Sequence, residues 1–304
     1  MKFTDSQLND IRRIFNQIAT ETYGLEREAL KATAFIPRQS GVGEWADSWT
    51  YKVLSEMGIA KFISDYAEDL PPVSRAMELR TVTIRQIADS YGYSEAEVMQ
   101  WLTAGIDLSR DDAETARRKI DEKVDEVLLV GDKSVGIEGL FNNSNVTTVT
   151  IEAGAKGTTD FKSKTKDEIV ASVQAMIDGA YALNGGNVVL DTIILPHGAF
   201  SHIATASVSA TGSTTILNHL KTVFREQGIT DWQESRKLDG IGESSKDRAV
   251  LYKKAANVVS YVLPIPFRQK APQECALHFK VPCYARIGGT VIKNPKAIVY
   301  ADGV

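Results

Sequence analysis

The segment at residues 41–93 constrains the fold of this 304-residue chain more than any other. Its apolar residues do not recur at a helical spacing, and the run at 77–87 is typical of extended chain without one clean apolar face. Pro71-Pro72 marks a turn, so the segment predicts two extended arms around a Pro-Pro tip. An isolated strand pair is only marginally stable in water. We therefore expect this hairpin to need support from elsewhere, which is a first indication of a partner.

Three amphipathic segments predict helices. Residues 4–22 open with a capping box and carry one apolar stripe, which must cover a surface of the same subunit or of a neighbour. A second helix opens with a capping box at Ser94 and Glu97 and is interrupted at 105–107. A third starts near Ser109 and is the longest and best specified. Its predicted apolar stripe is Ala113, Ala116, Ile120, Val124 and Val127.

Residues 146–260 alternate between helix and strand. Thr165 with Glu168 predicts the capped start of one helix, and a further helix is expected at 213–226. The strands expected here are 188–195, 229–232, 249–252 and 258–263. The remaining residues predict strands and turns, with strands at 277–281, 283–287 and 297–300.

The composition is that of an ordinary globular protein, with 43% hydrophobic and 24% charged residues, and the length predicts about two domains. A net charge of −4 argues against a surface whose main task is to neutralise nucleic-acid phosphates, but leaves room for a local basic face. No run approaches the roughly 20 apolar residues of a membrane helix. The start of the chain does not resemble a signal peptide, so synthesis in the cytoplasm is expected. Cys275 and Cys283 are expected to be free thiols.

No motif predicts a catalytic, cofactor-binding or metal-binding site. His197 and His202 lie five apart, so they do not share a helical face as zinc-binding pairs four apart do. Residues 163–166 match S-x-x-K, but the companion motifs S-D-N and K-T-G are absent, and a helix start with charged flanks explains the match. Residues 131–139 lack the G-K-[ST] ending of a phosphate loop. We therefore expect no enzyme, no cofactor and no metal, although enzymes can also assemble sites from scattered residues.

The segment that follows the longest predicted helix resembles a known family. Gly131-Asp132-Lys133 comes first, and then the run G-I-E-G-L-F-N-N-S-N-V at residues 136–146. This junction resembles that of major capsid proteins of tailed bacteriophages with the Hong Kong 97-type fold, and related bacterial nanocompartment shells carry similar G-L-x-N signatures. Residues 58–61 with 69–71 resemble the extended-loop region, and 286–291 with 294–298 resemble the C-terminal strands. The resemblance covers nearly the whole chain in order.

The resemblance implies an α+β chain with the Hong Kong 97-type capsid fold. Residues 1–45 would be the N-terminal arm, and 46–90 the extended β-hairpin loop. A peripheral domain with the spine helix would take 91–145, and an axial α/β domain 146–260. Residues 261–304 would be C-terminal strands that return to the peripheral domain. The interruption at 105–107 departs from the family, so a bent spine or a separate short helix is expected there.

Opposite charges gather on the two arms of the predicted loop. The acidic residues are Asp65, Glu68 and Asp69, and the basic residues are Arg75, Arg80 and Arg85. We expect them to pair with charges on neighbouring subunits and to fix the register of the contact. A solvated charged loop is the alternative. Trp45 and Trp49 are expected anchors where the loop joins the body, since aromatic residues dominate buried interfaces, and ordinary core packing is the alternative.

The function implied by the resemblance is that of a structural major capsid protein, which self-assembles through pentamers and hexamers into an icosahedral shell around double-stranded DNA. Its partners would be further copies of itself and packaged DNA bound nonspecifically. Scaffold, portal and decoration proteins are further candidates, and no membrane is expected. Its place would be the virion, after assembly in the host cytoplasm. One alternative is an encapsulin-like bacterial nanocompartment shell around protein cargo. A remote alternative is a soluble α/β enzyme or binding module.

Overall fold

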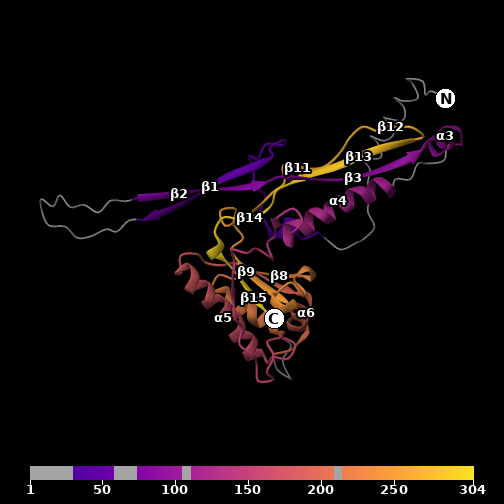
Figure 1. The fold of residues 1–304 in the computed structure, drawn as a ribbon. Helices are drawn as coiled ribbons and strands as arrows, with labels where there is room; N and C mark the ends of the chain where they lie inside the picture. Colours follow the sequence, from indigo (N-terminus) through magenta and orange to yellow (C-terminus); the bar gives the residue numbers. More distant parts are fainter. Residues whose placement is uncertain (1–29, 58–73, 105–110, 209–213) are drawn as a thin grey trace, which may run out of the picture.

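The computed structural model describes residues 30–57, 74–104, 111–208 and 214–304. Figure 1 shows three parts: a projecting strand pair, an elongated body that carries a long helix, and a compact body that contains the C-terminus. We call these parts the hairpin, the elongated body and the compact body. The predicted helix at 4–22 and the predicted turn at Pro71-Pro72 lie outside the described residues.

The hairpin consists of β1 (Ser48–Met57) and β2 (Ser74–Thr83), which pair antiparallel from Ser48↔Thr83 to Met57↔Ser74. Among the described residues these two strands pair with no third strand. The two predicted arms are therefore confirmed. In Figure 1 the strand pair extends away from both bodies.

The elongated body is built on a second antiparallel sheet. Strand β3 (Arg85–Ser94) pairs over its whole length with β13 (His278–Ile287). The other edge of β13 pairs with β11 (Ile265–Gln269) and with β12 (Gln273–Cys275). Ten residues of β3 thus belong to this body, and the predicted loop boundary at residue 90 is wrong for this reason.

Strand β13 also passes through a proline at which the sequence predicted a break between two strands. Pro282 lies opposite Ser90, in the middle of the pairing with β3. Proline lacks only the N–H donor, and the carbonyl of Pro282 still accepts from the N–H of Lys270 at 2.9 Å. The prediction of two separate strands at 277–281 and 283–287 is therefore wrong.

Two helices pack on this body, α3 (Glu95–Ala104) and α4 (Asp111–Leu129). The capping box is confirmed: the N–H of Ser94 donates to Glu97 Oε2 at 2.7 Å, and the N–H of Glu97 donates to Ser94 Oγ at 3.2 Å. The predicted stripe of α4 is buried, and the helix lies along β3 and β13. Two helices in place of one confirm the separate short helix, and the residues between them lie outside the described part of the chain.

The compact body contains a five-stranded sheet. In order across the sheet, its strands are β6 (Thr147–Val149), β15 (Ile298–Asp302), β9 (Arg248–Tyr252), β7 (Thr192–Pro196) and β8 (Asp231–Ser235). Its helices are α5 (Lys166–Asn184), α6 (His197–Thr205) and α7 (Ile216–Arg225). Helix α5 packs against β15, and α6 packs against β7 and β8. The predicted alternation and the capping box of Thr165 are confirmed.

The last strand corrects the predicted course of the C-terminus. Strand β15 lies between β6 and β9 in the compact body, whereas the sequence placed all of residues 261–304 with the peripheral part. Ile298, Val299, Tyr300 and Ala301 are all buried. A strand without a polar face is typical of a sheet that is covered on both sides. This strand is therefore an interior strand of the five-stranded sheet, next to the edge strand β6.

Short elements lie between the larger ones or beside them. They are α2 (Ala32–Phe35), the pair β4 (Gly131–Asp132) with β5 (Ile137–Glu138), the pair β10 (Val259–Val262) with β14 (Gly289–Ile292), and the 3₁₀ turns η1 (Arg236–Leu238), η2 (Glu243–Ser245) and η3 (Pro295–Ala297). The C-terminal end of α4 leads to the pair of β4 and β5 through Gly131, whose φ of +87° favours glycine.

The residues that carry the family resemblance join the elongated body to the compact one. Leu140 and Phe141 are fully buried. The hydroxyl of Tyr300 donates to the carbonyl of Leu140 at 2.5 Å, and Arg248 Nη1 donates to the carbonyl of Phe141 at 2.9 Å. Arg248 also forms a two-pronged ion pair with Asp302, at 2.6 and 2.9 Å. We call residues 140–143 the first seam.

Candidate functional site

The hairpin has two faces that meet different surroundings. Residues that lie opposite each other in an antiparallel pair share a face, and alternate residues of one strand point the same way. One face, the inner face, carries Trp49 opposite Val82 and Tyr51 opposite Arg80. The other, the outer face, carries Thr50 opposite Thr81, Lys52 opposite Leu79, and Met77.

The inner face holds the hairpin to its own subunit. Trp49 stacks on Tyr51 with ring centroids 5.2 Å apart. Together with Val82, these side chains pack against a buried cluster of Ile84, Val262 and Val291. Trp49 therefore contributes to packing within the subunit at the root of the hairpin. This is the second of the two roles that the sequence allowed for it.

Trp45 lies on the loop before β1 and is 63% exposed. The guanidinium of Arg286 lies 5.6 Å from the centroid of its ring, within the range of a cation–π contact. Arg286 is buried and also donates to Asp47 at 2.9 Å and to the carbonyl of Glu44 at 3.1 Å. The loop is thus fixed to β13 while most of the Trp45 ring faces solvent. A large aromatic surface is held in place and is not covered by its own subunit.

The outer face exposes apolar side chains. Met77 and Leu79 are 56% and 62% exposed, although both lie in a regular strand. Their neighbours on β1 and β2 include Thr50 and Thr81, whose hydroxyls are 2.9 Å apart. A two-stranded sheet with an apolar outer face gains stability only when another surface covers that face. The geometry makes this face suited to contact with another chain.

The predicted contact charges are only partly brought together. Asp65, Glu68 and Asp69 lie outside the described residues. Arg75 lies in β2 opposite Glu56, and Arg85 opens β3 opposite Ile287, so Arg85 belongs to the elongated body and the prediction that placed it on a loop arm is wrong.

Arg80 is already paired within its own strand. It donates to Glu78 at 2.9 and 3.1 Å, and this hydrogen bond holds the pKa of Glu78 below its ordinary value. Any contact that Arg80 makes with a neighbour therefore involves the pair it forms with Glu78.

The residues of the S-x-x-K match have structural roles. Ser163 Oγ donates to the carbonyl of Asp160 at 2.9 Å, and Lys166, the lysine of the pattern, pairs with Asp167 at 3.3 Å. Lys164, which lies between them, is buried and donates to the carbonyl of Glu152 and to Ser172 Oγ. Burial lowers the pKa of Lys164. Lys164 thus ties helix α5 to the preceding chain, while Ser163 and Lys166 each bind an acidic residue's carbonyl or carboxylate.

One histidine has a carboxylate partner that its sequence neighbourhood did not show. His197 Nδ1 lies 3.0 Å from Glu234 Oε2, because β7 leads into α6 and pairs in parallel with β8, which carries Glu234. In the described part of the chain, no group of three or more His, Cys, Asp or Glu side chains could hold a metal ion. Burial raises the pKa of the Cys283 thiol to about 11. No helix among the described residues is long and apolar enough to span a membrane.

The whole arrangement is the Hong Kong 97-type fold, which defines a class of shell-building subunits. The capsid of Myoviridae phage XM1 matches with a TM-score of 0.75 at 17% identity, over 94% of this chain and 95% of that one. The capsid of a native GTA particle matches at 0.66 and 14%, over 93% of both chains. A virus-like particle from Pyrococcus furiosus matches at 0.55 and 12%, over 98% of both chains.

The sequence itself shows the family. The model of the major capsid protein family matches residues 58–304, and the chain belongs to that family. It is a structural protein of a capsid, which forms the shell of a virion by self-association. The predicted family and fold are thereby confirmed. No curated protein matches the chain.

Sequence reasoning found the hairpin but missed its apolar outer face. It considered the charges and the two tryptophans, whereas the exposed apolar side chains of the strand pair are Met77 and Leu79. The two positions are separated by one residue and therefore share a face of any strand. That spacing was a usable signal, but which face the body covers depends on Val262 and Val291, about 200 residues away.

Proposed function

We propose that the protein assembles through pentamers and hexamers into an icosahedral shell around double-stranded DNA, with the hairpin of each subunit lying across the next subunit. The observation that carries this proposal is the exposure of Met77 and Leu79 on a strand pair that projects from both bodies (Figure 1). Full burial of each side chain would stabilise a contact by roughly 1.5–3 kcal/mol. Head-to-tail contacts of this kind close into rings, and the stabilisation of the contact is then repeated at every subunit of the ring.

The proposed division of labour follows the three parts of the molecule. The hairpin makes the contact around each ring, and the compact body takes the axial position at the ring centre. The elongated body is the peripheral domain, with α4 as its spine helix. Residues 1–45 would be the N-terminal arm. We propose no enzymatic activity, since the role of the chain is association.

The predicted contact residues form two groups in this proposal. Trp45 is the stronger anchor candidate because most of its ring faces solvent. Trp49 would act indirectly, because it holds the root of the hairpin to its own subunit. Asp65, Glu68, Asp69, Arg75, Arg80 and Arg85 would fix the register by pairing with charges on neighbours. Arg80 would do so together with Glu78, its partner on the same strand. Packaged DNA would be bound weakly and nonspecifically, in keeping with the net charge of −4.

The test replaces the apolar outer face by charge. We expect the double variant Met77→Glu/Leu79→Glu to fold and to form no particles, because four carboxylate oxygens would replace the apolar contact. Val189→Glu/Val223→Glu is the matched control, since it places the same two charges on exposed apolar residues of the compact body. Circular dichroism would check folding, and electron microscopy would count particles. Particles from the double variant at the yield of the control would refute the proposal.

The contents of the particles separate a virion shell from a nanocompartment. Nuclease-protected DNA in particles made during infection would support the proposed packaging role, with assembly in the host cytoplasm and with scaffold, portal and decoration proteins as further partners. Mass spectrometry that found a stoichiometric enzyme cargo and no DNA would contradict it.

A further inference from the structure

The two bodies are joined at a second place besides the first seam. The segment Lys31–Gln39, which we call the strap, passes from α4 across the compact body and on to β10. Lys31 Nζ donates to the carbonyl of Glu234 at 3.0 Å, the carbonyl of Phe35 accepts from the hydroxyl of Tyr252 at 2.8 Å, and the N–H of Gln39 donates to the carbonyl of Tyr261 at 2.8 Å. The strap therefore contacts β8, β9 and β10 in turn.

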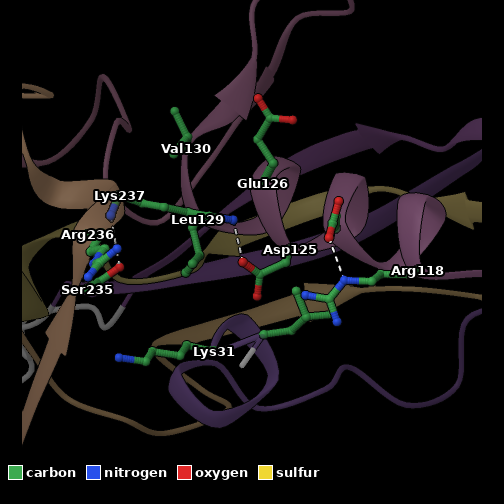
Figure 2. A pocket seen from close by; sticks show the side chains of 11 residues that line it. Lys31, Arg118, Asp125, Glu126, Leu129, Val130, Ser235, Arg236 and Lys237 are labelled. Carbon is green, nitrogen blue, oxygen red and sulfur yellow. Dashed lines mark hydrogen bonds and ion pairs between the residues drawn. The ribbon is translucent and has the colours of Figure 1, made fainter. Parts of the chain in front are cut away.

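One carboxylate connects the strap, α4 and the compact body. Asp125 lies in α4 and is only 5% exposed. Its Oδ1 accepts from the N–H of Ala32 at 2.7 Å, and its Oδ2 forms an ion pair with the ammonium of Lys237 in η1, directly after β8. Figure 2 shows Lys237 reaching across to Asp125. Each oxygen of the Asp125 side chain therefore binds a different segment: Oδ1 binds the strap, and Oδ2 binds η1.

Among the described residues, open space remains beside this contact. A pocket of about 420 Å³ lies between the start of the strap, α4 and η1, and is bordered by Lys31, Leu129 and Arg236 as well as by Asp125 and Lys237 (Figure 2). Close-packed side chains fix the distance between two elements, but an open pocket does not. On the pocket side of α4, the polar tie therefore adds a constraint to the apolar packing of Ala32, Phe35 and Leu129, which are buried in one core cluster.

The pocket is not suited to binding an anion. Three of the four cations that line it face acids of the same subunit: Lys31 pairs with Glu234 at 3.4 Å, and Arg118 pairs with Glu122 at 2.7 Å. Lys237 is matched by Asp125. Of these side chains only Asp125 is buried, with 6% of it exposed against 33% of Lys237. Displacement of Lys237 would therefore leave a buried charge uncompensated. The arrangement therefore suits a positioning role better than a binding role.

We propose that Asp125 is the positioning residue that fixes the angle between α4 and the five-stranded sheet, and that this angle sets the curvature of the shell. In an assembly of identical subunits, a small change in the shape of each copy is repeated at every interface and changes the closed particle. The first seam acts as the pivot, and the tie through Asp125, Lys237 and Ala32 prevents rotation about it. This inference rests on the proposed assembly into a closed shell.

The experiment compares particle diameters in three variants. Asp125→Asn removes the charge and replaces one acceptor oxygen by an NH2 group, so that the side chain can no longer accept from both Ala32 and Lys237. Lys237→Met removes the cation but leaves the bond to Ala32, and the double variant removes both charges. We expect all three to give particles with a distribution of diameters at least twice as broad as that of the wild type, measured by cryo-electron microscopy. Asp121→Asn is the matched control, because Asp121 lies on α4 in a more exposed pair with Arg117 at 3.8 Å. Its particles should keep the wild-type diameter.

The melting temperature separates positioning from stability. Lys237→Met leaves a buried carboxylate without its partner, so its subunit should melt below the wild type, and the double variant should recover most of that loss. A purely structural role predicts that the double variant also recovers the uniform diameter, whereas a positioning role predicts that it does not. Uniform wild-type diameters in Asp125→Asn and the double variant, or failure of both Asp125→Asn and Lys237→Met to fold, would overturn the inference. Wild-type protein that forms no particles would refute the proposed function instead.

Discussion

The five-stranded sheet of the compact body and the β1–β2 hairpin follow the same pairing rules but differ in what covers them. In the sheet, β7, β9 and most of β15 are buried along their length, and helices pack on them. In the hairpin, only the inner face at the root is covered, by Val262 and Val291. The compact body therefore completes its own core, while the hairpin leaves part of its apolar surface for another chain to cover.

The same difference separates two kinds of ion pair. Arg248 and Asp302 lie in the compact body with 10% of each side chain exposed, and Arg248 also binds a carbonyl of the first seam. Arg80 and Glu78 lie on the hairpin, where 35% and 61% of the side chains are exposed. Water screens the second pair but hardly reaches the first. We therefore expect the first pair to act on the fold of the subunit and the second to act on contacts between subunits.

The largest effect on stability should come from Arg248→Met. The change leaves Asp302 buried without its partner and removes the donor to the carbonyl of Phe141, so the free energy of unfolding should fall by about 3–5 kcal/mol. Denaturant unfolding of the unassembled subunit would measure the loss. Arg117→Met, in the exposed pair with Asp121 on α4, is the control and should cost less than about 1 kcal/mol. Equal losses in the two variants would contradict the contrast.

Local patterns predicted most of the elements but not their partners. The capping boxes at Ser94 and Thr165 and the stripe of α4 are properties of neighbouring residues, and all three are confirmed. The place of β15 could not be read in the same way, because an apolar strand of five residues fits either body. Its pairing with β9 and β6 depends on contacts about 50 and 150 residues away.

In the candidate site, too, local features could be predicted and long-range contacts could not. The hairpin was predictable because its extended arms and the lack of a clean apolar face are local features. Its inner and outer faces were not, since they are decided by the residues that the root meets in space. The role of Asp125 could not be predicted for a related reason: its partners Ala32 and Lys237 lie 93 and 112 residues away. The burial of the Asp125 side chain, which only the structure shows, indicates its role.

A smaller effect should come from Trp49→Ala, which tests the root of the hairpin. The ring is half-buried against Tyr51 and near the Ile84 cluster, so its removal should lower the free energy of unfolding by about 1–3 kcal/mol. Trp45→Ala should cost less than about 1 kcal/mol, because the ring is mostly in solvent and loses mainly its contact with Arg286. Thermal unfolding of the subunit and particle counts would be measured together.

A comparison of Trp45→Ala with Trp49→Ala distinguishes effects on folding from effects on assembly. If Trp45 serves as an anchor between subunits, its removal should reduce particle yield more than it reduces the melting temperature. The opposite ranking, with Trp45→Ala the less stable subunit, would show that the inner face does not hold the hairpin.

The smallest effect should appear at acidic pH, where the pairs Arg248–Asp302 and Arg80–Glu78 should contribute differently to stability. Burial raises the pKa of Asp302, but hydrogen bonds from Arg248 and the N–H of Glu243 outweigh it, so the pKa lies below its ordinary value. A carboxyl group whose pKa is lower in the folded state stabilises the fold above its unfolded value of about 3.9, and this stability is lost as the pH falls through the folded value. Unfolding in denaturant should therefore become easier below about pH 4.

The variants assign this acid loss to one part of the molecule. Asp302→Asn should lower stability at neutral pH, because Arg248 loses its partner, but should leave a flatter dependence between about pH 5 and pH 3. Glu78→Gln should leave the pH dependence unchanged, because the lowered pKa of Glu78 belongs to an exposed pair that water screens. If Glu78→Gln flattened the curve as much as Asp302→Asn, the hairpin would contribute to the fold of the isolated subunit. The division between a self-contained core and a projecting contact arm would then be wrong.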